Sequence, residues 1–293
     1  MSIEITTAFV KQYSAGVRML QQQRSSRLQD AVLNDPGVVG DRAFYDQVDA
    51  TAMAEVTNRH GDTEYTDTPH RRRMVTLATY DVADLVDRAD RRRLLNDPIN
   101  PYSRSMAAAA GRQIDDVVIA AFEATASTGV DGSGTSAFDT NFSFSEASAN
   151  AFAVADLVKA RRLLEEAENM EDEGDYSWHI VCAADQRQKL LGDSTLTSSD
   201  FNTVRALVNG QINQYLGLNF IKSQRTDVTS GGIRDVFVWV KASMQLAIGQ
   251  EPRAFMDVLP QKRHSIQVRY EQDCGATRMD EKGVVRILAD EIA

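Results

Sequence analysis

The sequence predicts a mixed α+β protein. Two long segments carry apolar residues at helical spacing, several short segments alternate like strands, and the C-terminal part is dominated by strand-type residues. The 293 residues can bury a large core without disulfides. No apolar run approaches the ~20 residues of a membrane span, so no membrane association is expected. A net charge of −10 argues against a surface that wraps nucleic acid tightly.

The N-terminal segment predicts a helix over residues 5–33. Its apolar stripe thins into the polar stretch 21–27, resumes at Leu28 and Val32, and ends at the turn sequence 34–37. The stripe begins with Phe9, Tyr13, Val17 and Leu20. Because an isolated helix of this kind is marginal in water, we interpret the segment as an arm that docks on something else.

The next segment predicts a long β-hairpin. Small residues alternate with polar ones over 48–57, a turn signal follows at 58–62, and residues 72–80 alternate again. Neither face of the hairpin carries enough bulk to form a core. Since an isolated two-stranded ribbon is barely stable, we expect the hairpin to lie on another chain.

Two helices and an α/β region follow. Asn100-Pro101 begins a helix that extends to about Ala126, and a second helix is predicted over about 150–170. The glycine-rich stretch 128–136 between them predicts a flexible loop. From Tyr176 onward the pattern predicts three strands (178–183, 218–221 and 236–240), two short helices (185–191 and 201–208) and C-terminal strands at 266–270 and 284–288.

A search for catalytic chemistry finds nothing. The sequence has no phosphate-binding loop, zinc-protease or nucleophile-elbow motif, and its two cysteines have no metal-binding spacing. The lone Gly132-Ser133-Gly134 follows a helix, so we interpret it as part of a loop. The four histidines, His60, His70, His179 and His264, are scattered. We therefore predict no catalytic, cofactor-binding or metal-binding residue.

Two charge clusters stand out. Seven carboxylates fall within residues 165–175 in a spacing that does not fit a calcium loop. A solvated helix end is the first interpretation, an acidic interface patch the second and a metal site the least favoured. Seven arginines interleaved with aspartates lie between 71 and 93. An intersubunit interface suits this mixed charge best, while a nucleic-acid patch and a solvated surface remain alternatives. The excess of 25 arginines over 7 lysines fits fixed ion pairs or simply genomic base composition.

Several local sequences resemble those of a known family. They are the opening Ile5–Ser14 with Gln21–Leu28, then Asp97–Tyr102, Arg112-Gln113-Ile114-Asp115, Gly275-Ala276-Thr277-Arg278 and Val284-Val285-Arg286-Ile287. In this order, over almost the whole chain, they resemble a tailed-phage major capsid protein of the Hong Kong 97 fold.

That resemblance implies an organisation and a function. It implies an N-terminal arm (1–40), an extended loop (41–97), a peripheral domain with a long spine helix (98–175), an axial domain (176–250) and C-terminal strands returning to the peripheral domain (251–293). Hexamers and pentamers would close into an icosahedral virion shell around double-stranded DNA, which they touch only weakly and without specificity. Assembly would take place in the host cytoplasm.

The resemblance also implies partners and contacts. We expect a portal protein, a cement or decoration protein as an optional addition and, because the arm begins near Ile5, a separate scaffolding protein. Some members of the fold cross-link through a lysine of the extended loop, but this chain has no lysine between Lys11 and Lys159. We therefore expect no such cross-link. The candidate intersubunit residues are Arg71, Arg72, Arg73, Arg91, Arg92 and Arg93 against a neighbour's Glu165, Glu166, Glu168, Glu171, Asp172 and Glu173.

Two rival functions remain. An encapsulin-like compartment would share the fold but enclose cargo proteins instead of DNA. A soluble α/β enzyme would place its site within 176–249, with His179, Cys182 and Asp185 as candidate residues. Such an enzyme would carry these residues in a concave pocket.

Overall fold

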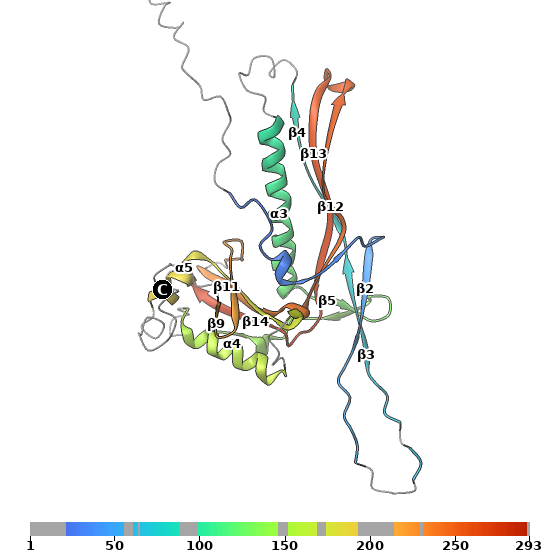
Figure 1. The fold of residues 1–293 in the computed structure, drawn as a ribbon, viewed down its shortest axis with the longest axis vertical. Coiled ribbons are helices and arrows are strands. Elements are labelled where there is room, and N and C mark those ends of the chain that lie inside the picture. The colour runs from blue at the N-terminus through green and yellow to red at the C-terminus, as the bar shows by residue number, and fades with distance from the viewer. Residues whose placement is uncertain are drawn as a thin grey trace, which may run out of the picture. The chain divides into compact units, whose positions relative to one another are not determined.

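The computed structural model describes residues 22–55, 61–63, 65–87, 99–145, 152–168, 174–192, 214–228 and 231–291 (Figure 1). Two compact units can be distinguished. Unit 1 comprises the described residues of Met1–Ser25, Tyr80–Arg112 and Pro252–Gln272, and unit 2 comprises those of Ser26–Thr79, Gln113–Glu251 and Asp273–Ala293. The predicted domain boundaries differ from this division and remain predictions.

Unit 2 contains a six-stranded sheet with the order β7-β14-β11-β8-β10-β9. Its strands are β7 (Ser143–Phe144), β8 (Trp178–Cys182), β9 (Gln214–Tyr215), β10 (Leu218–Lys222), β11 (Ile233–Val240) and β14 (Val284–Asp290). β8 pairs with β10 in parallel and with β11 in antiparallel register. Two helices, α4 (Val154–Glu166) and α5 (Ala184–Gly192), accompany the sheet.

The core of unit 2 explains why these residues form a sheet covered by a helix. Leu157, Ala160 and Leu164 recur at helical spacing on α4 and are fully buried against Ile180 of β8 and Val238 of β11. Elsewhere in unit 2, Phe122 packs with its ring centroid 4.9 Å from that of Phe237 and 4.7 Å from that of Trp239. The helix α3 (Ile99–Glu123), which carries Phe122, therefore ends in an aromatic cluster that buries a large apolar area.

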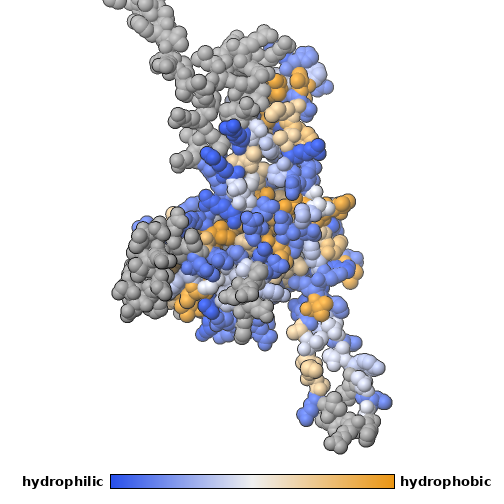
Figure 2. Space-filling view, viewed as in Figure 1, coloured by the Kyte–Doolittle hydropathy of each residue, from blue (hydrophilic) through white to orange (hydrophobic). Residues whose placement is uncertain are grey.

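The long helix α3 (Ile99–Glu123) confirms the helix predicted from Asn100. Two further sheets have the orders β1-β12-β13-β4 and β2-β3-β5-β6. Their strands are β1 (Leu33–Pro36), β2 (Arg42–Val48), β3 (His70–Thr76), β4 (Ala78–Val86), β5 (Ala126–Thr128), β6 (Gly134–Ser136), β12 (Met244–Leu259) and β13 (Ser265–Arg278). Among the described residues, no helix is long and apolar enough to cross a membrane. Figure 2 shows hydrophilic surface with scattered hydrophobic residues on the face in view.

Several sequence predictions were correct. The strands predicted at 178–183, 218–221, 236–240 and 284–288 and the helix at 185–191 are all present with small shifts of their ends. The second long helix is present but shorter, as α4. The predicted helix at 201–208 lies outside the described residues.

Other predictions were wrong. Residues 22–36 are not α-helical, because the segment forms a short 3₁₀ turn at Gln29–Ala31 and then β1, which pairs in parallel with β12. The first hairpin strand covers 42–48 rather than 48–57. The stretch 128–136 is not merely a loop, since β5 and β6 form a hairpin that pairs with β3. The 16-residue strand β12 was not predicted.

Candidate functional site

The three candidate residues of the enzyme hypothesis do not form a site. The Cys182 thiol is fully buried, and burial raises its pKa. His179 accepts or donates a hydrogen bond with the Ser177 hydroxyl at 3.0 Å and stacks on Trp239 with ring centroids 5.8 Å apart. Burial, together with the nearby charge of Lys241, lowers the pKa of His179 to about 4. Asp185 pairs with Lys189 on its own helix at 3.2 Å. These are structural contacts rather than a nucleophile with its base.

A concave surface lies elsewhere, at the base of the β2–β3 hairpin. It encloses about 650 Å³ and contains none of those three residues. Its walls come from β2, β3, the β5–β6 hairpin and the turn between β13 and β14. The lining residues are Asp46, His70, Arg71, Arg72, Arg73, Thr128, Gly129, Val130, Thr135, Ser136 and Glu281. Of the six arginines singled out from the sequence, Arg71–Arg73 therefore line this concave surface.

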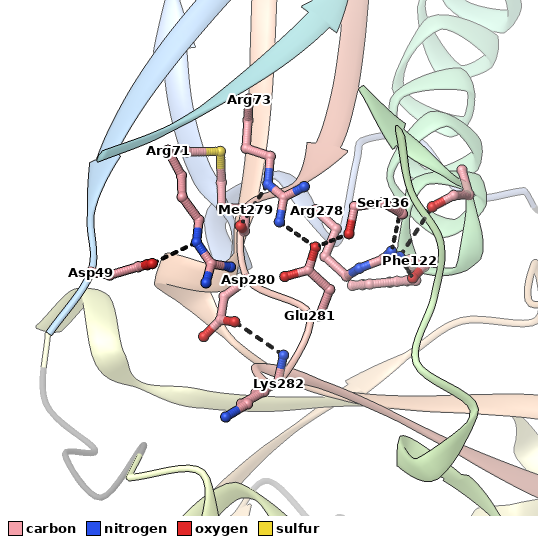
Figure 3. Close-up of polar contacts among 11 residues, drawn as sticks. Asp49, Arg71, Arg73, Phe122, Ser136, Arg278, Met279, Asp280, Glu281 and Lys282 are labelled. Carbon is pink, nitrogen blue, oxygen red and sulfur yellow. Dashed lines mark hydrogen bonds and ion pairs between the residues drawn. The ribbon is translucent and has the colours of Figure 1, made fainter. Parts of the chain in front are cut away.

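Arg73 forms the floor of this surface and is only 3% exposed. Its guanidinium donates to the Met279 carbonyl at 3.1 Å and pairs with the Glu281 carboxylate (Figure 3). The Ser136 hydroxyl donates to the same carboxylate. Burial by itself would raise the pKa of Glu281. The hydrogen bonds from Ser136 and from the Glu281 backbone, together with the charge of Arg73, outweigh burial, so this pKa lies below its usual value. Arg73 is thus committed to contacts within its own chain.

Arg278 is a second buried arginine next to this cluster. Its guanidinium donates to the carbonyl of Phe122 at 2.7 Å (Figure 3). It also donates to the Ala124 carbonyl at 3.1 Å and lies 5.3 Å from the centroid of the Phe138 ring. These carbonyls end the long helix, whose C-terminal backbone oxygens carry partial negative charge. Arg278 therefore caps the helix and joins it to β13.

Arg71 and Arg72 differ from Arg73 because their side chains remain 59% and 37% exposed. Arg71 pairs with Asp49 at 2.6 Å. Arg72 pairs with Asp46, which lies directly opposite on β2, through two hydrogen bonds of 2.5 and 3.1 Å. Exposed pairs of this kind contribute little to stability, and they leave the surface of the hairpin charged.

The candidate acidic residues are described only in part. Glu165 pairs with Arg161 at 2.7 Å and Glu166 with Arg162 at 3.3 Å, each one helical turn away on α4. Glu168 follows the helix with a positive φ of 63°. Glu171, Asp172, Glu173 and the arginines Arg91, Arg92 and Arg93 lie outside the described residues. The pairing of these two clusters between subunits remains a prediction.

In each unit, residues of the N-terminal motif 21–28 contact one residue of the motif 112–115, which lies 85 or more positions away in the sequence. In unit 1, Arg112 donates to the Gln22 side chain at 2.8 Å and to the Gln23 carbonyl at 3.0 Å. In unit 2, the fully buried Asp115 accepts hydrogen bonds from the Ser26 hydroxyl at 2.6 Å and from the Arg27 and Leu28 amides at 3.0 and 3.1 Å. The sequence pattern did not link these two motifs. The available signal was Asp115, a carboxylate on an apolar helix face, which needs hydrogen-bond partners when it is buried.

Comparison with known proteins agrees with this architecture. A family model described as phage capsid protein matches residues 5–291. A search of curated proteins gave no match. Among solved structures, the chain is similar to one from Mycobacterium phage Che8, with 16% identity and a TM-score of 0.71 over 95% of this chain and 96% of that one. It is similar to the capsid asymmetric unit of Cyanophage Pam1, with 17% identity and a TM-score of 0.75 over 98% and 97%. It also resembles the capsid of Ralstonia phage GP4, with 11% identity and a TM-score of 0.71 over 96% and 95%.

Proposed function

Because the chain belongs to the phage capsid protein family, we propose that many copies of it assemble as hexamers and pentamers into the icosahedral shell of a tailed double-stranded DNA phage. It is a major capsid protein, a structural protein of the virion capsid rather than an enzyme. The observation that carries the proposal is the family match over 287 of 293 residues, from 5 to 291, together with a fold shared with phage capsids.

The placement of the hairpin supports a geometric function. Residues 50–55 and 65–69 beyond β2 and β3 are exposed throughout. An extended ribbon of this kind gains stability when it lies on a neighbouring subunit. In a ring of identical subunits, the front of each chain meets the back of the next one until the ring closes. An encapsulin-like shell would use the same geometry, but the family match favours a phage shell.

We propose the finer features on the same basis. The shell assembles in the host cytoplasm with a separate scaffolding protein and a portal protein, with a cement or decoration protein as an optional addition. The shell touches packaged DNA only weakly, which agrees with a net charge of −10, since tight binding would require many neutralised phosphates. The domain boundaries predicted from the resemblance belong to this proposal.

We also propose that ion pairs between subunits set the register of the shell. Within the cluster Arg71–Arg73, Arg71 and Arg72 stay exposed, so each can meet a neighbour's carboxylate in addition to its own partner on the hairpin, whereas Arg73 is buried. Arg91–Arg93 and the acidic run 165–173 complete the proposed set. Ion pairs of this kind contribute more to specificity than to affinity.

Analytical ultracentrifugation of the purified chain tests the proposal. We expect species containing five or six chains of 32.4 kDa, and larger closed particles when a scaffolding protein is present. A chain that remains a monomer or dimer under both conditions would contradict the proposed function.

A further inference from the structure

The strand β2 leaves one of its edges unpaired in the described part of the chain. β2 is the outermost strand of the sheet β2-β3-β5-β6, and its seven residues pair only with β3 (Figure 1). An edge of this length presents backbone N–H and C=O groups that can pair with another strand.

The hydrogen bonds on either side of β2 show which residues face that edge. Asp41 accepts from the Leu77 amide at 2.9 Å and the Asp49 amide donates to Pro69 at 3.0 Å, so odd-numbered residues bond across to β3. Alternate residues of an antiparallel strand point their backbone groups to opposite sides. Consistent with this, the carbonyl of Arg72, opposite Asp46, faces β5 and accepts from Gly129 at 3.3 Å. Four residues therefore direct their backbone groups to the open edge: Arg42, Phe44, Asp46 and Val48.

Of the usual protections against pairing, this edge carries in the described part of the chain only the charged side chains of Arg42 and Asp46. Proteins block exposed edges with proline, lysine or a covering segment, and the sequence has neither proline nor lysine between 42 and 55. Phe44 and Val48 are 44% and 62% exposed, so apolar side chains flank the open backbone groups. The charge of Asp46 is already neutralised by Arg72. The edge is thus suited to accept a strand.

The same chain carries a segment that is suited to supply one. Residues 50–55 follow β2 directly, are all exposed and belong to no strand of the described chain. Their sequence alternates alanine at 50, 52 and 54 with Thr51, Met53 and Glu55, which is the period of a strand. They cannot fold back onto their own β2, because the chain continues from Val48 without a turn.

We propose that, in the shell, the hairpin segment 50–55 of one copy adds as a strand to the open edge of β2 of a second copy. This inference rests on the proposed function, because it requires neighbouring copies. Donor and acceptor are different surfaces of the same chain, so the contact is head-to-tail and can repeat around a ring. The strand addition satisfies backbone groups on both chains, and the alternate side chains Met53, Phe44 and Val48 set its register.

Disulfide cross-linking in mixed particles tests this contact. Three single variants are prepared: Phe44→Cys and Val48→Cys on the acceptor edge and Met53→Cys on the donor segment. The native Cys182 and Cys274 are buried, so they do not compete. Residues facing each other across adjacent strands have Cβ atoms about 4.5–5.5 Å apart, close enough for a disulfide after small adjustments. Chains of the Met53→Cys variant are co-assembled with chains of one acceptor variant and oxidised mildly.

We expect disulfide-linked dimers in mixed particles of Met53→Cys with one acceptor variant, at several times the amount found in particles of either variant alone. Equal amounts in mixed and unmixed particles would overturn the inference. Dimers formed by the acceptor variants alone would also overturn it, because they would indicate pairing between two β2 edges. Cross-links to a different protein would overturn it as well. Particles without the mixed cross-link contradict this inference only, whereas a chain that forms no particles contradicts the proposed function as well.

A proline variant provides an independent measurement. Val48→Pro removes an N–H that faces the open edge, and it leaves every N–H that bonds to β3 in place. Proline is tolerated at such a position of an edge strand. We expect its thermal midpoint to match that of the control Val48→Ala, while its particle yield falls at least about fivefold because the edge can no longer pair fully. Equal particle yields for the two variants would count against the added strand.

Discussion

At the scale of single residues, the buried ion pair between Arg73 and Glu281 stabilises the fold, whereas the exposed Arg71 is a candidate for contacts between subunits. Arg73→Met would leave the Glu281 carboxylate without its cation in a largely buried site. Breaking such a pair costs about 3 kcal/mol, whereas the matched change Arg71→Met, at an exposed pair, costs less than about 1 kcal/mol. Chemical denaturation of both variants measures the difference. A smaller loss for Arg73→Met than for Arg71→Met would contradict the buried role of Arg73.

His179 gives a pH dependence with a defined sign. Its folded pKa of about 4 lies below the value of 6.5 that the unfolded chain would show. The unfolded state therefore binds more protons than the folded state between pH 6.5 and 4, and stability falls as the pH falls through that range. We expect a loss of roughly 1–2 kcal/mol, reduced by partial solvent exposure of the ring.

The variant His179→Phe keeps an aromatic ring beside Trp239 and removes the titrating group. We expect its thermal midpoint to decline less between pH 6.5 and 4 than that of the unchanged chain. Glu281 also contributes an acid-labile part, because its folded pKa is lowered and its contribution is lost as the pH falls below the ordinary carboxylate range. The variant is therefore judged by the difference between the two curves. Superimposable curves would show that His179 is not responsible.

At the scale of elements, Gly275 lets β13 pass close to the end of β3. A Cβ atom at this position would meet the Thr76 carbonyl oxygen and come within 3.0 Å of the Val75 side chain. Gly275→Ala therefore forces a backbone shift, and we expect a loss of about 2–3 kcal/mol by overpacking. The control Gly249→Ala places its Cβ 3.2 Å from the flexible Leu77 side chain and should cost less. Thermal unfolding of both variants checks this order.

Elements with a strong local pattern could be predicted from the sequence, and elements defined by long-range pairing could not. The stripe of α3 follows a period of 3.6 residues, and the continuous apolar run 236–240 in β11 is typical of a strand that is buried on both faces. β12 was not predicted because its pattern changes from buried residues at Met244–Ile248 to mostly exposed ones from Glu251 onward. The segment 28–36 has helical spacing, yet pairing with β12 and the bond from Trp239 to the Ala31 carbonyl at 2.8 Å override it.

The candidate site shows the same division. The sequence located the cluster Arg71–Arg73 and assigned all three residues to an interface. The sequence could not indicate that Arg73 points to Glu281, 208 positions away, while Arg71 and Arg72 stay exposed. Strand alternation separates Arg72 from Arg73, but only the tertiary fold determines which face is covered.

At the scale of the whole molecule, the absence of lysine from residues 12–158 predicts a shell without lysine-based cross-links in the extended loop. Mature particles boiled in denaturant should therefore yield a single band near 32.4 kDa on a gel run under reducing conditions. A ladder of bands at multiples of that mass would contradict the prediction. The same particles on a non-reducing gel serve as the baseline for the disulfide cross-linking experiment.

In the proposed shell, one head-to-tail contact between copies of this chain repeats until the shell closes. Electron microscopy of the purified chain, with and without a scaffolding protein, makes this assembly visible. We expect rings of five and six subunits, tubes or closed polyhedra, with the hairpin of each subunit on its neighbour. A population of separate monomers or dimers under both conditions would contradict it.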